Sequence, residues 1–101
     1  MYGFPINWKK VAENDLGNYY VDLDSVKNIN GLTYYTDLVD FIEPFKSDYS
    51  AISRYAVDYK GENQKWLSLT TFSKEMGRGD INNQSGSNEI IFRSQILFIF
   101  L

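Results

Sequence analysis

Apolar and polar residues alternate along several stretches of the chain. In residues 19–23, Tyr19, Val21 and Leu23 share one side while Tyr20 and Asp22 share the other. The same alternation returns in residues 50–60. A period of two is the signature of a β-strand, because successive side chains point to opposite faces. Both stretches are therefore predicted to be strands.

Turn residues divide the chain between further strands. Asn30-Gly31 is a strong tight-turn dipeptide, since both residues tolerate positive φ. Residues 32–42 are rich in β-branched and aromatic side chains and are predicted to form a strand that stops at Glu43-Pro44. Residues 8–11 are predicted to form a short opening segment and residues 45–49 a loop. Residues 61–64 are predicted to form a polar turn, and residues 65–72 a strand that completes a hairpin with residues 50–60.

The last third of the chain changes character twice. Residues 73–88 are mostly polar and include three glycines, which predicts a long loop. Residues 90–101 are largely apolar and are predicted to form the last strand, although residues 89–95 also fit a helical period.

These segments together predict a mainly β fold, with α+β as the alternative. We expect one domain spanning residues 1–101, built on a single antiparallel meander sheet of about five or six strands. A long loop rich in Gly, Asn and Ser is expected to precede the last strand. The high aromatic content, 17% of residues, agrees with strands, because aromatic side chains suit a pleated surface.

Composition argues against most catalytic chemistry. The chain contains neither Cys nor His, so the common Ser-His-Asp and Cys-His arrangements are excluded. Only carboxylate, Tyr, Lys or Ser chemistry remains, and it would require strongly shifted pKa values. We therefore expect no enzymatic activity and no cofactor. The net charge of −3 and the scattered basic residues also argue against a nucleic-acid partner.

The N-terminal residues do not resemble a signal peptide, because they lack a long apolar stretch and a small-residue cleavage site. No segment reaches the roughly 20 apolar residues that a membrane-spanning helix needs. We expect no integral membrane segment.

Exposed aromatic rings are the best candidates for a binding surface. Adjacent Tyr pairs on a strand place one ring on each face, so some rings are expected to point outward. The tripeptide Arg78-Gly79-Asp80, which integrins recognise, lies in the predicted loop, although a turn that needs positive φ also explains its glycine and Gly77. The candidate binding residues are Tyr20, Tyr35, Tyr55, Trp66, Arg78, Gly79 and Asp80.

Two groups of acidic residues are considered as a Ca²⁺ site and as a catalytic carboxylate pair, and their spacing argues against both. Asp22 and Asp24 share a strand face, but they do not begin an EF-hand pattern, and we expect them to cap a turn instead of binding Ca²⁺. Asp37, Asp40 and Glu43 could supply a carboxylate pair, but Asp37 and Asp40 are three residues apart and face opposite sides of a strand, which argues against a catalytic pair. We expect a solvated strand face, and no metal site.

Several short motifs resemble one family. The chain resembles the surface-adhesin-E-like family of bacterial envelope proteins over roughly residues 8–79. The motifs that carry the resemblance are Trp8, residues 19–26, Asn30-Gly31, Ser50, residues 55–60, residues 67–69, residues 72–74 and residues 76–79. Members usually carry two cysteines. Tyr59 stands at the first of these positions, and the chain ends in an apolar run, residues 96–101, instead of the second.

The resemblance implies a non-enzymatic binding or adhesion module in the periplasm or on the cell surface, with an unidentified protein or glycan partner. Two other functions remain open. One is a structural or assembly subunit that pairs through an exposed strand edge. The other, which we consider weaker, is a hydrolase that uses carboxylate and Tyr groups.

Overall fold

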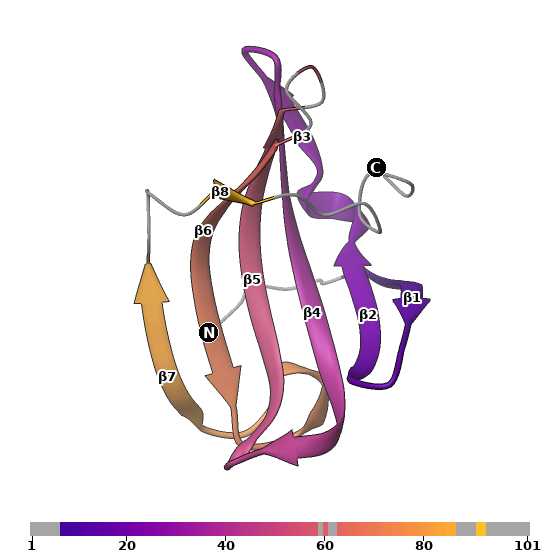
Figure 1. The fold of residues 1–101 in the computed structure, drawn as a ribbon, viewed down its shortest axis with the longest axis vertical. Helices are drawn as coiled ribbons and strands as arrows, with labels where there is room; N and C mark the ends of the chain where they lie inside the picture. The colour runs from indigo at the N-terminus through magenta and orange to yellow at the C-terminus, as the bar shows by residue number, and fades with distance from the viewer. Residues whose placement is uncertain (1–6, 59, 61–62, 87–90, 93–101) are drawn as a thin grey trace.

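In the computed structural model, one open antiparallel sheet contains every strand of the described residues, which are 7–58, 60, 63–86 and 91–92. Six strands follow the order β1-β2-β4-β5-β6-β7, while β3 pairs with β4 and β8 pairs with β6 (Figure 1). The strands are β1 Trp8–Glu13, β2 Gly17–Asp22, β3 Lys27–Ile29, β4 Leu32–Phe45, β5 Asp48–Asp58, β6 Asn63–Phe72, β7 Ile81–Gly86 and β8 Ile91–Phe92. Two 3₁₀ turns, η1 Leu23–Ser25 and η2 Glu75–Gly77, complete the elements.

The predicted fold class is confirmed: the chain forms a mainly β, antiparallel meander. The predicted turn at Asn30-Gly31 joins β3 to β4, and both residues have positive φ (52° and 84°). The predicted hairpin is the β5–β6 pair, in which Asp58 lies opposite Asn63.

Three local predictions were wrong. Residues 73–88 are not one loop, because Ile81–Gly86 form β7 against β6. The strand expected to stop at Glu43-Pro44 continues to Phe45, and residues 45–49 do not form a loop, because Phe45 pairs directly with Asp48. Pro44 is tolerated because it lies in a stretch where β4 does not pair regularly with β5.

The predicted last strand, residues 90–101, lies outside the described residues except for Ile91–Phe92, which form β8.

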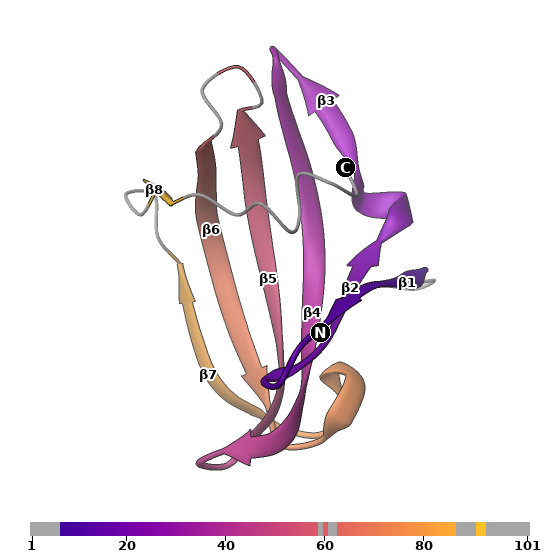
Figure 2. The same ribbon diagram turned by 45° about the vertical axis from the view of Figure 1, so that its right-hand side comes forward.

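Each face of the sheet carries its own apolar cluster. On the face that we call the Tyr35 face, Val21, Tyr35 and Val57 are buried together. On the opposite face, the Leu38 face, the buried cluster is Leu38, Ile52 and Phe72. Because side chains alternate along a strand, β4 contributes to both clusters. Figure 2 shows that the sheet is strongly twisted, with η2 at the end where β4 turns into β5 and β3 at the other end.

Candidate functional site

The β4–β5 hairpin ends in an irregular segment that turns apolar side chains outward. Register is lost between Asp40, which pairs with Ser50, and Phe45, which pairs with Asp48. Four residues of β4 therefore lie opposite one residue of β5. The hairpin closes through a turn in which Lys46 has positive φ (59°). Extra residues in one strand bend it and re-aim its side chains, which accounts for the exposure seen here.

Large apolar residues are exposed along this hairpin. Ile42 is 60% exposed, Phe45 63% and Tyr49 38%. Two neighbouring segments add one exposed apolar residue each, Leu16 and Ile81. The Ile42 N–H donates to the Leu16 carbonyl at 3.0 Å, which places the β1–β2 turn beside the hairpin. We call Leu16, Ile42, Phe45, Tyr49 and Ile81 the hairpin-end surface.

The start of β7 is tied to the tip of the hairpin. The Asn82 side-chain amide donates to the Ser47 carbonyl at 2.9 Å and to the Asp48 carboxylate at 2.8 Å. These bonds hold the segment that carries Ile81 against the tip. Lys46 Nζ lies 6.0 Å from the centre of the Phe45 ring, so a cation accompanies the most exposed of these side chains. The hairpin-end surface is therefore bordered by a positively charged side chain, Lys46.

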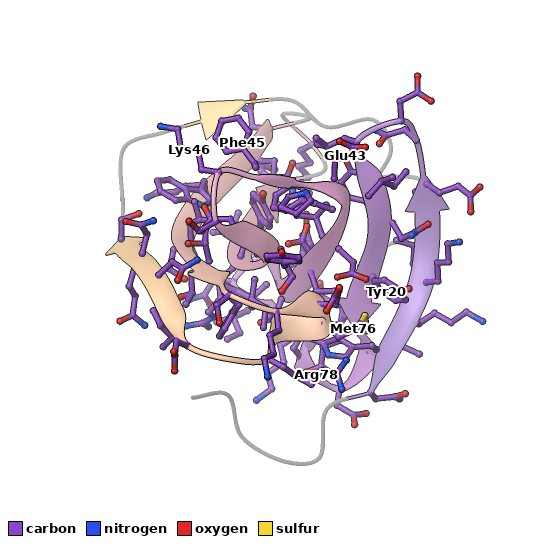
Figure 3. The ribbon with its side chains drawn as sticks, turned by 90° about the horizontal axis from the view of Figure 1, so that it is seen from below. Tyr20, Glu43, Phe45, Lys46, Met76 and Arg78 are labelled. Atoms are coloured by element: carbon purple, nitrogen blue, oxygen red, sulfur yellow. The ribbon has the colours of Figure 1, made fainter. Side chains whose placement is uncertain are left out.

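The η2 turn lies at the same end and is fixed to the Leu38 face. Figure 3, viewed from below, shows Met76 and Arg78 on one side of this end and Phe45 and Lys46 on the other. The Ser50 hydroxyl, which is fully buried, donates to the Lys74 carbonyl at 2.7 Å and accepts the Gly77 N–H at 2.8 Å. A Cβ on Gly77 would lie 2.7 Å from Ile52 Cδ1, so the buried Ile52 side chain would have to shift to admit any other residue.

The Arg78-Gly79-Asp80 tripeptide follows η2 and is exposed. Gly77 and Gly79 both have positive φ (68° and 81°), which confirms that the turn itself requires glycine at these positions. The Arg78 side chain folds back, because its Nε donates to the Glu75 carbonyl at 3.2 Å. The geometry of the tripeptide is thus accounted for by bonds within the turn.

Replacing Ser50 with alanine is expected to loosen η2. Two buried hydrogen bonds would be lost, and we expect the free energy of unfolding to fall by about 1–3 kcal/mol. Hydrogen exchange at the Gly77 amide should accelerate more than exchange in β5. The exposed Ser85→Ala variant serves as a control and should change neither quantity. Equal exchange at Gly77 in both variants would contradict this role for Ser50.

The structure places three of the four predicted aromatic residues on the Tyr35 face and Tyr20 on the opposite face. Tyr20 is half-buried on the Leu38 face, where it packs against the apolar cluster together with Met76. Tyr55 and Trp66 lie opposite each other on β5 and β6, on the Tyr35 face, and both are half-buried. The predicted outward role of Tyr35 is wrong: this residue is only 2% exposed, and its ring stacks on that of Tyr55 with centres 5.3 Å apart.

Tyr35 is buried because its hydroxyl has a partner inside the sheet. It accepts a hydrogen bond from the side-chain amide of Gln64, another fully buried residue. A buried Tyr hydroxyl needs such a partner, and the sequence pattern alone does not reveal it.

Asp37 also departs from its predicted environment. It was expected on a solvated strand face, but it is buried, between Val21 on β2 and Ser53 on β5. Burial raises the pKa of Asp37 from 3.8 to about 8, while a backbone hydrogen bond from Ser53 opposes the shift. The pKa of Tyr55 is raised too, mainly by burial and then by the nearby Asp37 carboxylate. Asp40 lies on the opposite face and accepts the Met76 N–H at 3.0 Å, so the two carboxyl groups do not form a pair.

Of the two acidic residues before β3, Asp22 caps a turn as predicted. Asp22 caps η1, since its carboxylate accepts the Asp24 N–H at 3.1 Å. Across the part of the chain that the structure describes, no cluster of three or more acidic side chains could hold a metal ion. Among the same residues, no helix has the length and apolar character required to cross a membrane.

The hairpin-end surface was missed by the sequence predictions because residues 45–49 were expected to form a simple loop. A signal was nevertheless present. Phe45 and Tyr49 are large aromatic residues within a short polar segment next to Pro44. Aromatic rings at the tip of a hairpin have no strand beside them to cover them, so their exposure could have been anticipated.

Comparison with known proteins identifies one family, whose model matches most of the chain. A family model described as surface-adhesin protein E matches residues 8–92. The fold is similar to that of protein E from non-typeable Haemophilus influenzae, with a TM-score of 0.63, 11% identity, and coverage of 88% of this chain and 66% of that one. A selenomethionine form of Haemophilus influenzae protein E gives a TM-score of 0.63 at 9% identity, covering 92% of this chain and 81% of that one.

A third structure of Haemophilus influenzae protein E gives a TM-score of 0.60 at 10% identity, with coverage of 85% of this chain and 70% of that one. At such identities the likeness concerns the fold alone. The chain spans just under two thirds of the length of the first of these protein E chains. No curated protein matches the chain at a significant level.

Proposed function

Because the chain belongs to the surface-adhesin protein E family, in which an adhesin-type role is expected, we propose that it is a non-enzymatic adhesion module that binds a protein partner through its hairpin-end surface. We further propose that it acts on the bacterial cell surface, as the family description suggests.

The observation that carries this proposal is the exposure of Ile42, Phe45 and Tyr49 on one hairpin. Single exposed apolar residues are normal on a protein surface, but several on one element indicate an interaction site. Protein interfaces favour an aromatic anchor surrounded by a polar rim. Phe45 fits the anchor, and Glu43 and Lys46, both exposed and labelled beside it in Figure 3, fit the rim.

A protein partner is favoured over a glycan at this surface. Sugars require several converging hydrogen-bonding groups as well as an aromatic ring, and the five residues of the hairpin-end surface are aliphatic apart from Phe45 and Tyr49. Among the candidate aromatic rings on the sheet faces, Tyr20, Tyr55 and Trp66 are half-buried, and Tyr20 lies on the face opposite to Tyr55 and Trp66. They do not form a common platform.

The other two functions receive less support. One of the two outer strands, β1, carries Lys9 and Lys10 and has an irregular register after Lys10, and both features discourage pairing with another strand at that edge. For hydrolysis, Asp37 is the carboxyl group with a strongly raised pKa, but it is buried in the sheet and cannot reach a substrate.

The proposal predicts that Phe45→Ser reduces binding of the purified chain to cultured epithelial cells by about tenfold or more, because an aromatic anchor is removed from the interface. The matched control is Leu23→Ser, which removes an apolar residue of similar exposure from η1. Binding should be measured by titrating labelled protein, with circular dichroism to verify folding.

A separate variant, Asp80→Glu, tests whether the Arg78-Gly79-Asp80 tripeptide contributes to binding. We expect it to leave binding unchanged, because the Arg78 side chain is engaged within its own turn. Equal losses for Phe45→Ser and Leu23→Ser, or no loss for Phe45→Ser, would overturn the assignment of the hairpin-end surface. A loss confined to Asp80→Glu would move the site to the η2 turn.

A further inference from the structure

A pocket of about 400 Å³ lies on the Leu38 face at the β3 end of the sheet, away from the hairpin-end surface. In Figure 2, β3 stands at the end opposite to the β4–β5 turn. The volume falls within the range of sites for small ligands. The residues that line the pocket are Asp24, Ser25, Lys27, Ile29, Tyr34, Tyr35, Thr36 and Arg54.

Strand register explains why these side chains converge. Lys27 on β3 pairs with Tyr34 on β4, and Arg54 on β5 pairs with Thr36, so all four side chains point to the same face. η1 closes one side of the pocket, because the Ser25 hydroxyl accepts the Thr36 N–H at 2.9 Å. The hydroxyl also donates to the Asp22 carbonyl at 2.7 Å, which fixes its position.

Two cations meet in this pocket although the chain as a whole is acidic. Lys27 and Arg54 come from different strands, both are exposed, and within the described residues neither forms a salt bridge. The guanidinium group of Arg54 presents a planar fork of donors that matches a carboxylate. A single carboxylate therefore suits the pair better than a neutral ligand.

The remaining lining residues restrict the kind of anion. Tyr34 and Ile29 provide an apolar wall that suits the C–H face of a sugar ring. Thr36 offers a hydroxyl group, and the carboxylate of Asp24 can accept hydrogen bonds from hydroxyl groups. Asp24 would also repel a doubly charged group such as phosphate more strongly than a singly charged carboxylate. A carboxylate, several hydroxyl groups and an apolar face occur together in an acidic sugar.

We propose that this pocket binds one carboxylated sugar unit, such as the terminal acidic residue of a glycan. Arg54 and Lys27 hold the carboxylate, Tyr34 contacts the ring, and Asp24 accepts hydrogen bonds from its hydroxyl groups. The site is independent of the hairpin-end surface, so the two can fail or succeed separately.

The test is an NMR titration of the isotopically labelled chain with 3′-sialyllactose, with glucuronic acid as a second acidic probe and lactose as the neutral control. We expect saturable shifts in the amides of β3 and around Arg54 with the acidic probes, and none with lactose. Arg54→Gln and Lys27→Gln should each weaken binding by about tenfold or more. Because both side chains are exposed, the thermal melting curves should not change.

Lys74→Gln is the charge-matched control, since Lys74 is exposed and lies beside η2 at the other end of the sheet. It should bind like the unmodified chain, and so should Phe45→Ser. The absence of shifts with both acidic probes would overturn the proposal. Equal shifts with lactose, or equal weakening by Lys74→Gln, would do the same, because binding would then not depend on the two cations of the pocket.

Discussion

Replacing Leu38 with alanine is expected to lower the free energy of unfolding by about 2–5 kcal/mol, the range for removing a large aliphatic side chain from a packed core. Leu38 is fully buried in the centre of β4, between Tyr20 on β2 and Ile52 on β5. Its Cδ1 also lies against η2, near the position that a Cβ on Gly77 would occupy. The cavity left by alanine would thus open between the sheet and the turn.

Urea unfolding followed by circular dichroism measures this loss. Ile42→Ala on the same strand is the matched control, because its side chain is largely exposed and its removal should cost little. A decrease for Ile42→Ala as large as that for Leu38→Ala would contradict the packing described here. In a small domain, the expected loss for Leu38→Ala is a large part of the total stability.

Stability is expected to fall as pH rises from about 4 to about 8. Burial raises the pKa of Asp37 to about 8 in the folded chain, whereas an exposed carboxyl group titrates near 3.8. Between these values the folded state binds one proton more than the unfolded state, so raising the pH favours unfolding. The slope is about 1.4 kcal/mol per pH unit within this window. The stabilisation is complete below the unfolded pKa and is lost as pH passes the folded pKa.

The chain is well suited to this measurement because it contains no His. Ordinary side chains change charge little between pH 5 and pH 8, so the slope reports mainly on Asp37. Asp37→Asn should flatten the profile and make the chain more stable than the unmodified protein at pH 8. The exposed Asp15→Asn variant should keep the slope. An unmodified chain whose stability does not change between pH 5 and pH 8 would show that the folded state does not keep Asp37 protonated.

Alternation along the chain was sufficient to predict most of the sheet. The stretch that contains Tyr19 and Val21, the Asn30-Gly31 turn and the β5–β6 hairpin are all found as expected. The family resemblance drawn from short motifs is confirmed by the match over residues 8–92. Local patterns succeed here because strand and turn preferences are determined mainly by neighbouring residues.

Which side chains are buried was harder to predict than which residues form strands. β4 supplies buried residues to both faces of the sheet, so alternation does not separate its solvent side from its core side. Asp37 and Tyr35 therefore appeared to face outward although they are buried. β7 was missed because residues 82–86 carry no apolar side chain and every residue of β7 is exposed. Backbone pairing with β6 holds this strand, and a side-chain pattern does not reveal such pairing. The pocket combines residues from η1, β3, β4 and β5, so it depends on register.

The most direct test of an adhesion function is saturable binding of the purified chain to intact epithelial cells, measured before and after mild protease treatment of those cells. A protein partner at the hairpin-end surface predicts saturable binding that protease treatment abolishes and that an excess of unlabelled chain displaces. Binding that does not saturate, or that the excess unlabelled chain does not displace, would contradict the proposed function.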